Sequence, residues 1–190
     1  MLSTTDAIVL SLQPHSDKAH VLHAYTRACG RVNYMVYGLG RKHAIGLYTP
    51  LSVVRITSSS ANGRPHAVKE AVPLSTNVLT NDPYKSAIAL FISEVLYHVL
   101  RHPMPDEPMY AYLEQAVKAL NESDAPENFH LAFLVGLADK LGFAMEEVPV
   151  LPKTRQERQK QIRALCAYFE EHVETWQAPK SLDVLMEVFD

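Results

Sequence analysis

The spacing of apolar residues changes near residue 80, and this change limits the chain to two differently built parts. Before residue 80, apolar and β-branched residues come in short runs separated by turn-forming residues. After it, apolar residues recur every three or four positions over longer stretches. The first pattern is typical of β-strands and the second of α-helices. We therefore predict an α+β protein, with an all-β module at residues 1–80 and an all-α module at 81–190.

Five short strands are predicted in the first module, with turn residues between them. They are residues 7–12, 21–26, 32–37, 51–57 and 66–71. The Asn62-Gly63 pair suits a hairpin turn between the last two. Because the strands leave little room for crossover helices, we predict a small five-stranded antiparallel barrel.

The second module contains helices with recognisable starts and stops. Asp82 and Pro83 suit the N-cap and first position of a helix, and its many apolar residues place that helix at the centre of a bundle. Thr154 to Glu157 has the capping-box pattern, and Gly142 suits a helix stop. The predicted helices are residues 83–100, 108–120, 127–141, 154–176 and 181–189.

The net charge of −3 conceals an uneven distribution. Residues 1–80 carry eight basic and three acidic side chains, a net charge of +5. Residues 81–190 carry ten basic and eighteen acidic side chains, a net charge of −8. A basic module joined to an acidic one suggests an anionic partner for the first, and an ordinary solvated surface is the alternative interpretation.

The sequence carries no recognisable catalytic motif. No serine lies in a Gly-x-Ser-x-Gly frame, and Gly38-x-Gly40 lacks a third glycine because His43 stands there. We therefore expect no enzyme, no cofactor and no small-molecule substrate. The most apolar stretch, residues 87–100, is interrupted by polar residues and is too short to cross a bilayer, so we expect a soluble protein with no membrane contact.

Metal-ligating residue types are present without metal-binding spacing. The histidine groups are His15, His20 and His23 in the first module and His98 and His102 in the second. The first group has no neighbouring cysteine or carboxylate pair, and Val99 stands where a zincin-type helix needs glutamate. Cys29 and Cys166 are too few for a four-cysteine zinc site and fit a reducing cytosol. We expect no metal.

A basic and aromatic set in the predicted barrel is the best candidate for a binding site. Single strands are held by positive grooves that track phosphates and by rings on which bases stack. Alternation along a strand places Tyr34 and Tyr37 on opposite faces, and we expect one or two of the tyrosines at positions 25, 34, 37 and 48 to be exposed. The candidate DNA-binding residues are Arg27, Arg31, Tyr34, Tyr37, Arg41, Lys42, His43, Arg55, Arg64 and Lys69.

An ordered series of segments runs through nearly the whole chain. The segments are residues 5–10, 25–31 and 38–42 in the first module and 82–91, 128–134, 141–143 and 180–185 in the second. Together they resemble the RecO family of bacterial DNA repair proteins, in particular its Bacteroidetes-like members. The resemblance implies that the N-terminal barrel is an OB-fold, and that Arg41 and Lys42, with Arg27 and Arg31 beside them, contact DNA.

The resemblance also implies a function. Family members are non-enzymatic mediators of DNA repair and homologous recombination that bind single- and double-stranded DNA and anneal complementary strands. With RecR they help to load RecA on DNA coated by single-stranded DNA-binding protein, whose acidic C-terminal tail docks on the helical module. A cytoplasmic, nucleoid-associated location follows. The alternative is a protein-interaction adaptor that acts through the acidic helical module and has little DNA affinity.

The sequence departs from the family pattern in its C-terminal part. Many relatives have a longer C-terminal domain, some with a four-cysteine zinc module. Here a short Pro-bearing linker leads from Phe143 to Thr154, and Cys166 stands alone on a predicted helix. We therefore expect a shortened helical module without zinc. Because acidic surfaces repel DNA, we also expect strands to be confined to the barrel and its junction with the helices.

Overall fold

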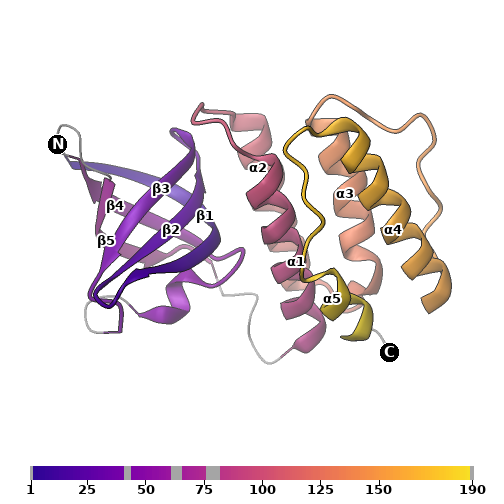
Figure 1. The fold of residues 1–190 in the computed structure, drawn as a ribbon, viewed down its shortest axis with the longest axis horizontal. Helices are drawn as coiled ribbons and strands as arrows, with labels where there is room; N and C mark the ends of the chain where they lie inside the picture. Colours follow the sequence, from indigo (N-terminus) through magenta and orange to yellow (C-terminus); the bar gives the residue numbers. More distant parts are fainter. Residues whose placement is uncertain (1, 41–43, 61–65, 76–81, 189–190) are drawn as a thin grey trace.

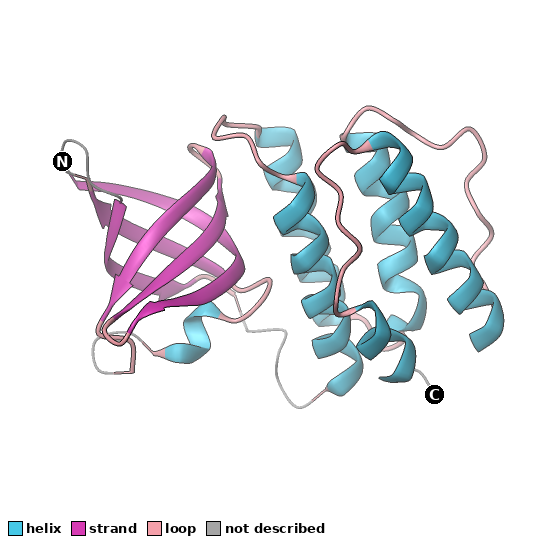
Figure 2. Ribbon diagram, in the orientation of Figure 1, coloured by secondary structure: helices cyan, strands magenta, loops and turns pink. Residues whose placement is uncertain are grey.

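A β-barrel and a set of helices lie side by side along the long axis of the molecule (Figure 1). The computed structural model describes residues 2–40, 44–60, 66–75 and 82–188. All the strands lie in the N-terminal part and the α-helices in the C-terminal part (Figure 2). The α+β class predicted from the sequence is confirmed.

Five strands close into a barrel in the order β1-β2-β3-β5-β4. Their bounds are β1 Leu2–Ser16, β2 Ala19–Thr26, β3 Gly30–Tyr37, β4 Val53–Ser59 and β5 His66–Pro73, and a short 3₁₀ helix, η1, spans Ile45–Tyr48. The five-stranded OB-like barrel is confirmed. The antiparallel prediction is wrong at one pairing, because β3 and β5 close the barrel in parallel, through Tyr34 with His66 and Met35 with Ala67.

Strand β1 extends beyond the predicted residues 7–12 at both ends. Pro14 lies inside the strand rather than ending it, because it sits near the hairpin end, opposite His20 and beside a register shift. At the other end, residues 2–6 pair with β4. Their side chains are mostly hydroxyl-bearing, and Thr4 bonds across to Thr57 at 3.0 Å. A search for apolar alternation therefore misses this part of the strand.

The helices begin close to where the sequence places them. They are α1 Pro83–Val99, α2 Glu107–Glu122, α3 Phe129–Lys140, α4 Arg155–His172 and α5 Leu182–Val188, with a 3₁₀ turn, η2, at Pro126–Asn128. Asp82 caps α1 and the capping box opens α4, as predicted. Helix α4 ends at His172, before the predicted Trp176. Trp176 still contacts Phe169 from outside the helix, with ring centroids 5.3 Å apart, which prolongs the apolar pattern.

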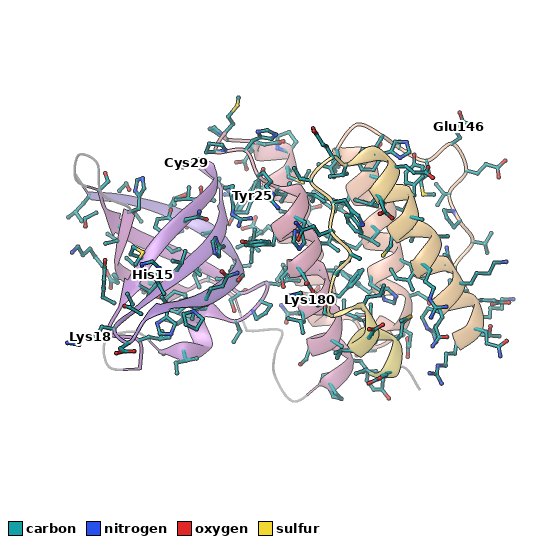
Figure 3. The ribbon with its side chains drawn as sticks, viewed as in Figure 1. His15, Lys18, Tyr25, Cys29, Glu146 and Lys180 are labelled. Carbon is teal, nitrogen blue, oxygen red and sulfur yellow. The ribbon has the colours of Figure 1, made fainter. Side chains whose placement is uncertain are left out.

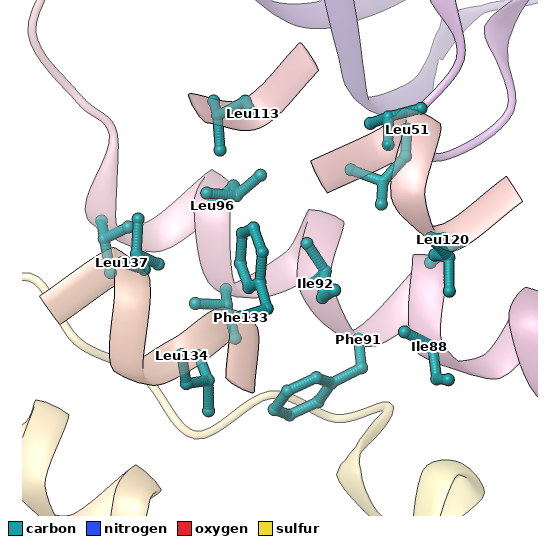
Figure 4. Close-up of a cluster of buried hydrophobic side chains, with 14 of the residues drawn as sticks. Leu51, Ile88, Phe91, Ile92, Leu96, Leu113, Leu120, Phe133, Leu134 and Leu137 are labelled. Carbon is teal, nitrogen blue, oxygen red and sulfur yellow. The ribbon is translucent and has the colours of Figure 1, made fainter. Parts of the chain in front are cut away.

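Helix α1 lies at the centre of the molecule, as its apolar circumference predicts. Ile88, Phe91, Ile92 and Leu96 are buried, and Figure 4 shows them among Leu residues of the neighbouring helices and Leu51 from the barrel side. The same core cluster contains Ile8, Leu10, Tyr25, Leu51 and Val53 from the barrel. A second cluster fills the barrel interior. The barrel and the helices are therefore joined by a shared core.

The edge of β3 at the junction is covered by the segment between α1 and α2. The backbone N–H of Arg31 donates to the carbonyl oxygen of His102 at 3.1 Å. Gly30 has a φ of +63°, and a Cβ there would collide with the carbonyl oxygens of His102 and Met104. The close approach of the two backbones therefore depends on glycine at position 30.

We predict that Gly30→Ala lowers the free energy of unfolding by about 2 kcal/mol or more. Left-handed backbone costs an L-residue about 1–2 kcal/mol, and the collision with backbone adds to that cost. Gly46→Ala is the matched control, because a Cβ at Gly46 meets nothing within 4 Å. Urea unfolding measures both variants, and equal effects would contradict this account of Gly30.

Stability should also fall in acid because of a histidine buried in the helical core. Burial, together with the nearby charge of Arg158, lowers the pKa of His130 from 6.5 to about 3. The unfolded chain then binds a proton between these values and the folded protein does not, so stability is present above pH 6.5 and declines below it. This histidine lowers the free energy of unfolding by about 1.4 kcal/mol for each pH unit below 6.5. We expect the His130→Gln variant to lack this decrease. Urea titrations from pH 7 to 4.5 test this, and identical pH profiles would show that His130 does not contribute.

Candidate nucleic-acid interface

The outward face of β1, β2 and β3 is divided between a half that contacts α1 and a half that does not. At the end of the barrel near the helices, two cross-strand pairs of β2 and β3 face outward. They are Tyr25 opposite Arg31 and His23 opposite Asn33. His23 lies edge-on to Tyr97 of α1, with ring centroids 5.0 Å apart. Figure 3 shows Tyr25 toward the helices and Lys18 at the remote end of the barrel. The remote half is the part of this face that α1 does not contact.

Arg31 lies in the covered half and holds the C-terminal end of α1. Its Nη1 donates to the carbonyl oxygens of Tyr97 and Leu100 at 3.2 and 3.3 Å, and its guanidinium lies 4.4 Å from the Tyr97 ring centroid. Carbonyls at a helix C-terminus carry partial negative charge, which offsets the buried cation. Burial lowers the pKa of Arg31. Arg31, which the sequence analysis predicts to contact DNA, is thus engaged by α1 in this structure.

Arg27 is likewise engaged by the helices. Its Nη2 donates to Glu114 at 2.9 Å, its Nε lies 3.5 Å from a carboxylate oxygen of Glu107, and its guanidinium covers the Tyr110 ring at 4.5 Å. All three partners belong to α2. Arg27 therefore links the barrel to α2, and two carboxylates already neutralise its charge.

The barrel tyrosines divide as strand alternation predicts. Tyr34 is 3% exposed and lies in the barrel core, where burial raises its pKa to about 12. Tyr25 and Tyr48 are also buried, whereas Tyr37 is 51% exposed. The expectation of one or two exposed tyrosines is confirmed by Tyr37. The ring of Tyr34, by contrast, is not accessible to a base in this structure.

The remaining described candidates lie on β4 and β5. Arg55 forms a two-point ion pair with its cross-strand partner Asp6, at 2.7 and 3.2 Å. Lys69 is exposed, and no ion pair joins it to another described residue. The other predicted site residues, Arg41, Lys42, His43 and Arg64, lie outside the described residues.

The remote half of the barrel carries Lys18, Tyr37 and Lys69, which we call the outer barrel end. Ala19, next to Lys18, pairs with Tyr37. Tyr37 and Lys69 each lie two residues beyond the parallel pair of Met35 and Ala67, on the outward side of adjacent strands. The sequence candidates omitted Lys18. The meander order would have placed it there, because the turn between β1 and β2 lies beside the end of β3.

The histidine groups considered from the sequence do not assemble into a metal site. In the part of the chain that the structure describes, no cluster of three or more His, Cys, Asp or Glu side chains could hold a metal ion. His23 instead bonds to Asn33 at 2.7 Å, and burial lowers its pKa. The described surface at the outer barrel end thus offers two lysines, each next to an exposed carboxylate in the sequence (Asp17 and Glu70), and the exposed ring of Tyr37.

Comparison with known proteins agrees with this architecture. The family model "Recombination protein O N terminal" matches residues 1–75, and "Recombination protein O C terminal" matches residues 80–148. The chain belongs to the RecO family. The two matched regions correspond to the barrel and to the helices through α3.

Relatives of this RecO-family chain carry the name "DNA repair protein RecO". The protein from Phocaeicola vulgatus is 38% identical over 153 residues, and the one from Porphyromonas gingivalis 35% over 150. Each match covers 75% of this chain and 61% of the relative. The protein from Christiangramia forsetii is 26% identical over 238 aligned positions, which cover both chains fully. Among the described residues, no helix is long and apolar enough to span a membrane.

We predict that Arg31→Ala destabilises the protein by about 2–3 kcal/mol, because it removes two charge-assisted hydrogen bonds and leaves two carbonyls without this donor. Arg55→Ala is the matched control, since it removes one exposed barrel guanidinium, and its urea midpoint should change far less. If Arg31→Ala unfolds at the wild-type urea concentration, the bonds to α1 do not hold the junction.

Proposed function

We propose that this RecO-family chain acts in DNA repair and homologous recombination by binding DNA through its barrel. The observation that carries the proposal is the family match over both parts of the chain. The excess of positive charge in residues 1–80 supports it. A polyanion gains affinity from such a surface through release of its counterions, with no need for a particular base sequence.

The binding surface in this proposal is the outer barrel end together with the basic residues Arg41, Lys42 and His43. Tyr37 is the last residue of β3, so an exposed ring stands four positions before Arg41 in the sequence. A base can stack on Tyr37 while Lys18, Lys69 and these basic residues contact phosphates. Arg27 and Arg31 are left out of this contact set, because α1 and α2 already engage them.

Such a surface suits strand annealing without covalent chemistry. Cations that neutralise phosphates reduce the repulsion between two strands. A ring that stacks on the face of a base leaves its Watson–Crick edge free to pair. We extend the proposal to a non-enzymatic mediator that binds single- and double-stranded DNA and works with RecR. It would help RecA to displace single-stranded DNA-binding protein, whose C-terminal tail would dock on the helices.

We predict that two changes weaken single-strand binding in different ways. Arg41→Ala with Lys42→Ala should lower the slope of log K against log salt by about 0.7 per lost phosphate contact. Tyr37→Ala should weaken binding by about 1–3 kcal/mol, the value of one stacked base, and leave that slope unchanged. Fluorescence anisotropy with labelled oligo-dT at several salt concentrations measures both quantities.

Tyr84→Ala is the matched control for Tyr37→Ala, because Tyr84 is a partly exposed tyrosine on α1. The full chain is used, since separating the barrel from the helices would expose their shared core. A binding constant that does not change with salt concentration would refute the DNA-binding proposal. So would wild-type affinity in all these variants. If such a chain still bound RecR or single-stranded DNA-binding protein, the adaptor alternative would hold.

A further inference from the structure

The acidic helical part contains one strongly basic stretch, at the beginning of α4. Five of the ten basic residues in 81–190 fall within residues 153–163, where Glu157 is the single acidic residue. The stretch thus carries a net charge of +4 inside a region of −8. Averaging over the helices conceals it, as averaging over the chain conceals the basic barrel.

Four of these cations are exposed, and we call them the α4 basic face. They are Lys153, Arg155, Lys160 and Arg163. Lys160 and Arg163 lie three positions apart, so they project from neighbouring turns on one side of the helix. The fifth cation, Arg158, is partly buried and donates to Asn128 at 2.9 Å. It therefore does not belong to the exposed set.

The carboxylate within the stretch is engaged by backbone N–H groups at the start of the helix. Glu157 Oε2 accepts hydrogen bonds from the backbone N–H groups of Lys153 and Thr154, at 2.9 and 3.1 Å. These bonds lower the pKa of Glu157 and hold its carboxylate at the start of the helix. Among the described residues, no carboxylate forms an ion pair with Lys160 or Arg163.

The chemistry of the surrounding surface favours phosphates over bases. The exposed neighbours on this side of α4 are Gln156, Ala164, Ala167 and, two turns after Arg163, Glu170, none of which can stack on a base. The nearest ring in α4, Tyr168, is partly buried and donates its hydroxyl to the Phe143 carbonyl at 2.9 Å. Contacts without stacking suit the backbone of a paired duplex rather than a single strand.

We propose that the α4 basic face binds the phosphate backbone of double-stranded DNA without regard to sequence. This rests on the proposed role in DNA repair. From Arg155 to Arg163 the helix rises about 12 Å, and B-DNA presents a phosphate about every 3.4 Å along each strand, so several cations can meet one duplex. The site lies at the end of the molecule remote from the barrel (Figures 1 and 3). This site would lie outside the barrel and its junction, where the sequence led us to expect DNA.

An acidic peptide fits the site less well. Val150, Leu151 and Pro152 form the apolar side of a groove of about 450 Å³ against α4, which could hold apolar peptide side chains. Glu157 lines the same groove together with Lys153 and Lys160, so its charged side chains sum to +1. A peptide in the groove would leave Arg155 and Arg163 outside its contacts, whereas the backbone of a duplex can contact these two cations together with Lys160.

The test compares two double variants. One carries Lys160→Ala and Arg163→Ala, and the control carries Lys118→Ala and Lys140→Ala. Both variants lose two cations, but Lys118 and Lys140 each lie within 4.0 Å of a carboxylate on their own helix. Anisotropy is measured on the full chain with a short blunt duplex and with oligo-dT, at several salt concentrations. Thermal unfolding of both variants establishes that each is folded at the assay temperature.

We expect the α4 variant to bind the duplex about tenfold more weakly, with a salt slope lower by about 0.9 per lost contact. Its affinity for oligo-dT should change by less than twofold, because the barrel holds that strand. Wild-type duplex binding, or an equal loss in the control variant, would overturn the proposal. Loss of binding to an acidic, apolar peptide with duplex affinity intact would identify a protein-docking face instead. Loss of oligo-dT binding in the Tyr37 variant and in the double variant of Arg41 and Lys42 is a separate result, so the two proposals can fail independently.

Discussion

The apolar contact between the barrel and α1 is the interaction on which the rest of the structure depends. Leu51 enters this contact with a φ of +59°, a backbone conformation that costs a non-glycine residue free energy and persists only where packing enforces it. Ile8, Leu10 and Tyr25 reach the same core from β1 and β2. Because separation would expose apolar surface on both sides, the two parts behave as one body. The polar contacts of Arg27 and Arg31 surround this core.

This junction decides how much of the barrel's charge can act on a ligand. Arg27 is paired with two carboxylates of α2 and Arg55 with Asp6, while the guanidinium of Arg31 donates to carbonyls of α1. The net charge of +5 in residues 1–80 therefore overstates the field that an approaching polyanion meets. The remaining described cations, Lys18 and Lys69, each stand beside an exposed carboxylate in the sequence, Asp17 and Glu70. Three of the eight basic side chains of residues 1–80, those of Arg41, Lys42 and Arg64, lie outside the described residues.

The sequence predicted the helices and strands better than the contacts between them. Apolar spacing and capping residues are local, so Asp82, Gly142 and the Thr154 capping box mark helix ends without knowledge of the rest of the chain. Alternation separated Tyr34 from Tyr37 but could not say which one faces inward. The contact of Arg31 with α1 was not predicted, because a charged outward residue looks the same in sequence whether solvent or a helix covers it. The parallel pairing of β3 with β5 also escaped prediction, since no local pattern records it.

The charge between the two proposed DNA surfaces bears on how they could be used together. Outside residues 153–163, the helical part carries five basic and seventeen acidic side chains, a net charge of −12. Screening limits each charge to about 8–10 Å in physiological salt, so the α4 basic face can attract DNA locally despite this background. One continuous DNA segment that ran from the barrel to α4 would have to cross the acidic surface. Two separate segments, one at each end of the long axis, would avoid it. The distribution of charge therefore favours bridging of two DNA segments over wrapping of one.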